Sequence, residues 1–205
     1  AIRVPAHPTA HKLLSAFGGG IAAPSANPSG KVSPTTAQHV LDGLQDRIAA
    51  VLDDGACEVG VESTIIGFDD GRAVLLRPGG LPIEDIAACL GYQPLPPQSE
   101  EITAPGQLTS HYAPDCQMRL NAETPDADEA YLAFGPTASF PATLNLSPTA
   151  DLREAAANLF AYLREIDAVA KSAGLKKIAV ARVPETGLGR AINDRLRRAA
   201  APRPA

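Results

Sequence analysis

The sequence predicts an α/β protein in two parts joined by a proline-rich segment. Strand-like and helical segments alternate along residues 117–205, which is the order of a small α/β domain. The composition changes at Gly91, because residues 92–106 hold four prolines and no periodic apolar pattern. The apolar fraction of 45% and the charged fraction of 20% are typical of a folded globular protein. We therefore divide the chain into residues 1–91, a linker over 92–116, and residues 117–205.

Capping and turn residues predict the elements of the first part. Pro8 suits the first position of a helix, which the glycines at 18–20 would end. Ser33 as the N-cap and Pro34 after it predict the start of a second helix. The residues at 69–71 predict the turn of a hairpin between strands over 61–68 and 72–77. The other expected elements are strands over 2–4, 21–23 and 48–52, and a short helix over 83–90.

The last part alternates between strands and helices. Asp151 and Glu154 form an acidic variant of the capping box and predict a helix that continues to a stop at Gly174. A second, basic helix is expected over 189–200. The expected strands cover residues 118–121, 131–134, 143–146 and 177–183.

Charge and composition exclude several classes of protein. No apolar run is long enough to span a membrane, and no signal peptide is visible. The three cysteines are widely spaced, so we expect free thiols, a cytoplasmic location and no zinc site. Net charge is −5, yet residues 176–205 hold eight basic and two acidic side chains. Binding of RNA would therefore depend on this tail.

Familiar catalytic and cofactor signatures fail on inspection. The stretch 187–192 imitates a dinucleotide fingerprint, but its third glycine is replaced by Ile192, so we predict a structural turn. Gly30-Lys31 lacks the spacing of a phosphate-binding P-loop. The four histidines lack metal-ligand spacing, and a surface position is expected for the pair His7 and His11. We therefore assign no catalytic nucleophile and no metal ligand.

Three polar segments remain as candidates for a binding site. The loop over 23–36 is rich in hydroxyl groups and leads into a helix N-terminus, which would suit an anion or would simply cap the helix. The predicted hairpin pairs Thr64 with Arg77 and brings Ser63 beside them, which suits an anionic ligand or forms a polar strand edge. Residues 105–114 would serve as a lid or only as a tether.

Several stretches together resemble the threonylcarbamoyl-AMP synthase family in its two-domain form. This form has a YrdC-like domain, a linker and a C-terminal Sua-five-type domain. The resemblance implies a twisted-sheet α/β fold for the first part and a small Rossmann-like α/β fold for the last. The matching stretches are residues 2–8, 23–30, 33–37, 60–66, 76–80, 111–114, 187–189 and 191–195.

The resemblance implies a nucleotidyltransferase that converts L-threonine, bicarbonate and ATP, with Mg²⁺, into threonylcarbamoyl-AMP and pyrophosphate. A downstream transferase would then modify tRNA, so tRNA is an indirect partner. By the same resemblance Arg3, Ala23 and Ser63 would hold threonine. Four residues would contact ATP: Ser25, Ser33, Arg77 and Tyr112. Asn27 is a weaker candidate in the same loop.

The chain departs from the family in lacking the N-terminal half of the YrdC-like domain, which carries a Lys/Arg motif. We therefore expect either a fragment or a natural short form whose activity alone is in doubt. Segment 107–110, before His111, is also neutral, where some relatives carry basic residues. Two alternatives stay open. One is an accessory RNA-binding module without catalysis, and the other is a carbamoyl-transfer domain of the hydrogenase-maturation type.

Overall fold

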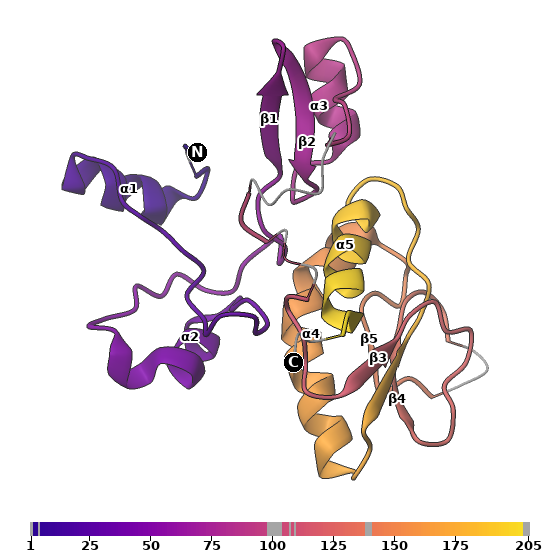
Figure 1. Ribbon diagram of the computed structural model, residues 1–205. Coiled ribbons are helices and arrows are strands. Elements are labelled where there is room, and N and C mark those ends of the chain that lie inside the picture. Colours follow the sequence, from indigo (N-terminus) through magenta and orange to yellow (C-terminus); the bar gives the residue numbers. More distant parts are fainter. Residues whose placement is uncertain are drawn as a thin grey trace.

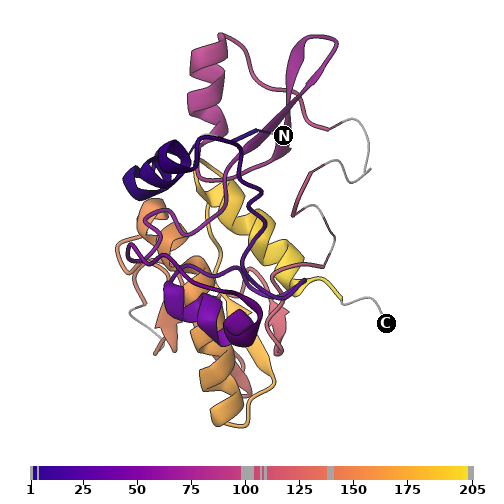
Figure 2. The same cartoon turned by 90° about the vertical axis from the view of Figure 1, so that its left-hand side faces the viewer.

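The computed structural model describes residues 2–3, 5–97, 104–106, 108, 110–137 and 141–202, and it confirms an α/β protein (Figure 1). The hairpin and one short helix lie together at the top of Figures 1 and 2, and the parallel sheet with its two helices forms the larger body below. The elements in chain order are α1 (Pro8–Phe17), α2 (Ala37–Leu44), the 3-10 turn η1 (Gln45–Arg47), β1 (Ile65–Asp69), β2 (Arg72–Arg77), α3 (Ile83–Leu90), β3 (Gln117–Arg119), β4 (Glu129–Ala133), β5 (Leu144–Asn145), α4 (Leu152–Ser172), β6 (Lys177–Val180) and α5 (Gly189–Ala200).

The last part is a parallel sheet with helices α4 and α5 packed on one face. The strand order is β3-β6-β4-β5. Ala130, Leu132, Ile178 and Val180 point into the main core with both helices, and the alternate residues form a smaller cluster on the other face. The sheet, both helices and the turn before α5 therefore confirm the predicted alternation. Each strand ends one to three residues earlier than expected, and β3 and β4 also begin earlier.

Asp151 caps α4 as the sequence predicts, but only half of the capping box forms. The Asp151 carboxylate accepts from the backbone N–H groups of Arg153 and Glu154 at 2.7 and 2.8 Å. The Asp151 N–H donates to the Ser147 hydroxyl at 2.9 Å, and Glu154 also bonds that hydroxyl. The fully buried Ser147 hydroxyl thus accepts the hydrogen bond from the Asp151 N–H that the Glu154 carboxylate would accept in a complete box.

Replacing the cap of α4 should destabilise the main core. We expect Asp151→Ala to lower the free energy of unfolding by about 1 kcal/mol, because two N–H groups lose their acceptor. Urea denaturation followed by circular dichroism measures this. Asp151→Asn is the matched control, because its amide oxygen still accepts. Equal losses in the two variants would contradict a capping role.

The hairpin forms with the predicted turn, but its register changes at the open end. Phe68 pairs with Ala73 and Gly67 with Val74, as predicted. An irregularity between Ile65 and Ile66 then places Arg77 opposite Ile65, so the predicted pairing of Thr64 with Arg77 is wrong. A bulge adds one residue to one strand, and here the extra residue is Leu76, between Leu75 and Arg77.

Four other expectations for the first part are wrong. Residues 21–23 and 48–52 form no strand, because nothing in the described part of the chain pairs with them, and Ile21 and Leu52 are exposed. Ser33 does not cap α2. Thr36 is the cap, and its hydroxyl accepts from the His39 N–H at 3.2 Å. Ile2 and Arg3 lie outside any strand, and Val4 lies outside the described residues.

The segment after α3 joins the hairpin before the chain enters the last part. Leu95 exchanges backbone hydrogen bonds with Ala73 and Leu75 at 2.9 and 2.8 Å. Tyr112, Ala113 and Cys116 are buried at the end of the predicted linker.

All three cysteines are free, as predicted. No helix within the described ranges has the length and apolar character needed to cross a membrane.

Candidate functional site

The Glu62 carboxylate lies where four segments of the chain meet. Its Oε2 accepts from the Tyr112 hydroxyl at 2.6 Å and from Nη2 and Nε of Arg195 at 3.0 and 3.2 Å. Nη1 of Arg77 lies 3.5 Å from the same oxygen. Glu62 precedes β1, Arg77 ends β2, Tyr112 lies near the end of the predicted linker, and Arg195 lies on α5. We call these four residues the Glu62 cluster.

Burial and charge fix the ionisation of this cluster. Burial would raise the pKa of Glu62, but Arg195, the Tyr112 hydroxyl and Arg77 together outweigh it and lower the pKa below its ordinary value. Burial and the neighbouring Glu62 raise the pKa of Tyr112. The cluster therefore holds one carboxylate, one neutral phenol and two guanidinium groups. It carries one positive charge in excess.

Arg77 is the cation of this cluster that has donor capacity to spare. Its Nη2 donates to the Ser63 carbonyl at 2.7 Å and its Nη1 to the Pro105 carbonyl at 3.0 Å. The residue is 5% exposed, and its buried Nε has no hydrogen-bond partner within the described ranges. A buried donor without a partner is costly, and an anionic oxygen would satisfy it.

Gly106 brings the backbone of the segment expected to serve as a lid or a tether directly over this cluster. Its φ is +80°, and a Cβ at this position would lie 2.6 Å from the Tyr112 hydroxyl oxygen and 3.0 Å from Nη1 of Arg77. Only glycine allows such a close approach with this backbone angle. Residues 104–106 therefore cover Arg77, although residues 98–103, 107 and 109 lie outside the described part.

Four of the seven predicted site residues meet around Glu62. Ser33 donates to Oε1 of Glu62 at 3.4 Å, Ser63 offers its carbonyl to Arg77, and Arg77 and Tyr112 belong to the cluster. Arg3, Ala23 and Ser25 are exposed, and no hydrogen bond or ion pair of the described residues joins them to it. The structure thus brings Ser63, predicted for threonine, together with three of the four residues predicted for ATP, and it leaves Arg3, Ala23 and Ser25 apart from them.

Asn27, the weaker candidate, is partly committed within its own loop. Its Nδ2 donates to the carbonyls of Pro28 and Lys31 at 2.9 and 3.0 Å. Its buried Oδ1 has no partner among the residues described. Asn27 therefore shapes the turn before Ser33, and its carbonyl-type oxygen keeps a free acceptor position.

Glu62 and Arg195 were not singled out as site residues by the sequence. Both lie in stretches that carry the family resemblance, 60–66 and 191–195. The usable signal was a lone carboxylate beside two hydroxyl residues at the end of a predicted strand. Nothing local connects Glu62 with a residue 133 positions further along the chain.

The arginines of α5, which form part of the basic tail, are paired with neighbouring carboxylates. Arg195 bonds Glu62 and Asp194, while three other arginines of α5 form ion pairs of their own. These pairs are Arg190 with Glu84 at 3.2 Å, Arg197 with Glu185 at 2.7 Å and Arg198 with Asp194 at 3.1 Å. An RNA surface needs basic side chains that are free to meet phosphates, and α5 does not offer such a set.

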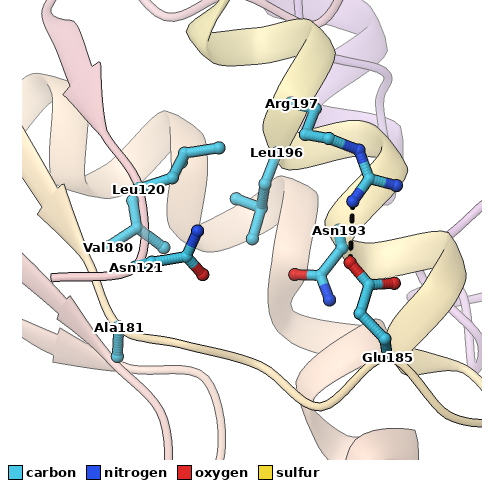
Figure 3. A pocket seen from close by; sticks show the side chains of 8 residues that line it. All are labelled: Leu120, Asn121, Val180, Ala181, Glu185, Asn193, Leu196 and Arg197. Carbon is cyan, nitrogen blue, oxygen red and sulfur yellow. Dashed lines mark hydrogen bonds and ion pairs between the residues drawn. The ribbon is translucent and has the colours of Figure 1, made fainter.

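A small cavity of about 60 Å³ opens at the carboxyl ends of β3 and β6 and contains none of the predicted site residues (Figure 3). Asn121 and Asn193 face it from opposite sides, and the Glu185–Arg197 pair closes one edge.

Within the described ranges no group of three His, Cys, Asp or Glu side chains could hold a metal ion. The Glu62 carboxylate is already shared by two arginines, so it does not fit a resident Mg²⁺.

Comparison with known proteins connects both parts of the chain to one enzyme family. A family model described as the C-terminal domain of threonylcarbamoyl-AMP synthase matches residues 81–201, and one described as telomere recombination matches residues 1–79. The chain is 36% identical to the threonylcarbamoyl-AMP synthases of Pyrococcus abyssi and Bacillus subtilis, over 97% and 98% of its length. It spans 63% and 62% of those two relatives.

A solved structure gives the same result for the fold. The crystal structure of P. abyssi Sua5 complexed with L-threonine superimposes with a TM-score of 0.80 at 36% identity. The match covers 97% of this chain and 63% of that one. The H234A/Y235A variant of P. abyssi Sua5 superimposes with a TM-score of 0.79.

Proposed function

The chain belongs to the threonylcarbamoyl-AMP synthase family. From that premise we propose that it acts as a nucleotidyltransferase that forms threonylcarbamoyl-AMP. The substrates would be L-threonine, bicarbonate and ATP, and the products threonylcarbamoyl-AMP and pyrophosphate. The product would serve tRNA modification through a separate transferase, in the cytoplasm. The observation that carries this proposal is the buried Arg77, with an unpartnered Nε among the described residues and a surplus positive charge around it.

The proposed chemistry needs no covalent intermediate on the protein. The threonine amine adds to CO₂ derived from bicarbonate and gives a carbamate. A carbamate oxygen then attacks the α-phosphorus of ATP, the bond to the bridging oxygen breaks, and pyrophosphate leaves. Arg77 would stabilise the charge that develops on the phosphate oxygens. Mg²⁺ would arrive with the nucleotide, because it commonly binds substrate phosphates with few protein ligands.

The remaining site residues keep their proposed roles. Ser33, Arg77 and Tyr112 would contact ATP, which their position around Glu62 supports. Ser25 would contact ATP from the exposed loop, and Arg3, Ala23 and Ser63 would hold threonine. The crystal structure of P. abyssi Sua5 complexed with L-threonine supports threonine as the substrate class. The division into residues 1–91, 92–116 and 117–205 is likewise proposed.

Removing the Arg77 side chain should abolish most of the proposed activity. We expect Arg77→Ala to reduce threonine- and bicarbonate-dependent release of pyrophosphate by about 100-fold or more in the purified protein, because a charged donor to the reacting phosphate is lost. Arg72→Ala is the control, since Arg72 lies at the exposed end of the same strand. Activity close to wild type would remove Arg77 from the site. Absence of substrate-dependent release in the wild type would refute the proposed reaction.

The two alternative functions receive less support. An accessory RNA-binding role rested on the basic tail, whose arginines on α5 are paired with carboxylates. A carbamoyl-transfer domain of the hydrogenase-maturation type would not account for the family match over residues 81–201.

A further inference from the structure

We propose that Arg195 on α5 is a positioning residue for the nucleotide side of the site, and that it acts through the Glu62 carboxylate on Tyr112 and Arg77. The inference rests on the proposed function for its ligand, ATP. Arg195 belongs to the last part of the chain, whereas its partners Glu62 and Pro78 belong to the first part. The carbonyl of Pro78, which accepts from Arg195, lies 117 positions earlier in the sequence.

The donors of Arg195 are committed to this one arrangement. Nε and Nη2 point to Oε2 of Glu62, and Nη1 donates to the Pro78 carbonyl at 2.6 Å and to Asp194 at 2.8 Å. The side chain is fully buried, and its guanidinium lies 5.7 Å from the centre of the Tyr112 ring. A buried cation with fixed partners holds its carboxylate in one place, because any other position leaves a charge unpaired.

Arg195 also limits how strongly Glu62 can pair with Arg77. Both guanidinium groups approach Oε2 of Glu62, but Arg195 lies at 3.0 Å and Arg77 at 3.5 Å. If Arg195 lost its charge, Arg77 would be the remaining cation beside this carboxylate in the cluster, and their pair would tighten. The charge of Arg77 would then be neutralised by Glu62 and would be less available to an anionic ligand.

The same carboxylate connects Arg195 with the segment that carries Tyr112. The Tyr112 hydroxyl donates to Oε2 of Glu62 at 2.6 Å, and Tyr112 has a left-handed φ of 60°. The next residue, Ala113, donates its N–H to the Gly30 carbonyl at 3.3 Å. A non-glycine residue keeps such a backbone angle only where its surroundings hold it. Release of Glu62 should therefore loosen this segment.

Binding of ATP and of threonine to purified variants tests the proposal. We expect Arg195→Met, which keeps an apolar stem of similar length, to weaken ATP binding by about tenfold or more. Binding of threonine should change less than about twofold, which a general loss of structure would not allow. Arg197→Met is the matched control on the same helix, because Arg197 is exposed and pairs with the exposed Glu185.

A double variant separates positioning from simple damage to the core. In Glu62→Gln combined with Arg195→Met, the introduced amide oxygen still accepts from Tyr112 but cannot neutralise Arg77. We expect ATP binding to recover most of the tenfold loss. The proposal is overturned if Arg195→Met binds ATP like the wild type, or if ATP and threonine weaken equally and the double variant recovers neither.

Hydrogen exchange gives a reading that is independent of ATP. The Ala113 amide should exchange faster in Arg195→Met than in Arg197→Met or the wild type, and equal exchange overturns the proposed positioning. If the wild type binds no ATP, the proposed function fails, and this exchange measurement alone decides the role of Arg195.

Discussion

Substituting Gly60 by alanine should separate the first part of the chain from α4. Gly60 has a φ of +64°, and a Cβ there would lie 2.5 Å from the Cα of Ala157 and closer still to the carbonyl oxygen of Ala156. Both atoms belong to the backbone of α4, and a helix backbone cannot move aside as a flexible side chain can. The left-handed backbone costs about 1–2 kcal/mol and overpacking about 1–3 kcal/mol more. We therefore expect Gly60→Ala to lower the free energy of unfolding by about 2–5 kcal/mol.

Gly55→Ala provides a control with the same backbone requirement. Gly55 has a φ of +86°, but no atom lies within 4 Å of an added Cβ. Urea denaturation should show only the backbone contribution in this variant. Because Gly60 lies two residues before Glu62, Gly60→Ala should also reduce ATP binding, whereas Gly55→Ala should not. Equal stability losses in the two variants would show that the approach to α4 is not tight.

The sequence predicts well those elements whose signals are local. The glycine after α1, the Asp70-Gly71 turn and the Asp151 cap each determine an element boundary through the chemistry of a few neighbouring residues. The buried stripe of α4 follows from apolar spacing in the same way. Two expected strands, over residues 21–23 and 48–52, do not form, because an apolar run does not reveal whether another strand will pair with it.

The candidate site depended on contacts that local patterns cannot show. A one-residue irregularity in the hairpin moved Arg77 away from Thr64, and no pattern of apolar residues predicts a bulge at Leu76. Thr64 instead bonds the Leu81 backbone at 2.6 Å. The choice of Thr36 over Ser33 as cap of α2 has a similar cause, because Ser33 is buried against Glu62. The family resemblance identified the stretches that meet, but it did not indicate Glu62 as their common acceptor.

Substituting Glu62 by alanine should destabilise the protein strongly and at the same time disrupt the site. The fully buried Arg195 would lose its main carboxylate partner, Arg77 would lose its nearby negative charge, and the Tyr112 hydroxyl would lose its acceptor. Removal of one partner from a buried ion pair typically costs about 3–5 kcal/mol. We expect a loss of this size in the free energy of unfolding at neutral pH, measured by urea denaturation, together with loss of ATP binding. Glu185→Ala, which breaks an exposed pair with Arg197, should cost less than about 1 kcal/mol.

The pH dependence of the Glu62→Ala effect gives the sharper test. The pKa of Glu62 is lowered in the folded protein, so the unfolded chain binds a proton at a higher pH than the folded chain. The stabilisation from Glu62 is therefore fully present above its ordinary pKa of 4.5 and is lost as the pH falls through the lowered folded value. The difference in stability between wild type and Glu62→Ala should shrink as the pH falls below about 4.5. A difference that stays constant from neutral to acidic pH would mean that Glu62 contributes by packing and not by its charge.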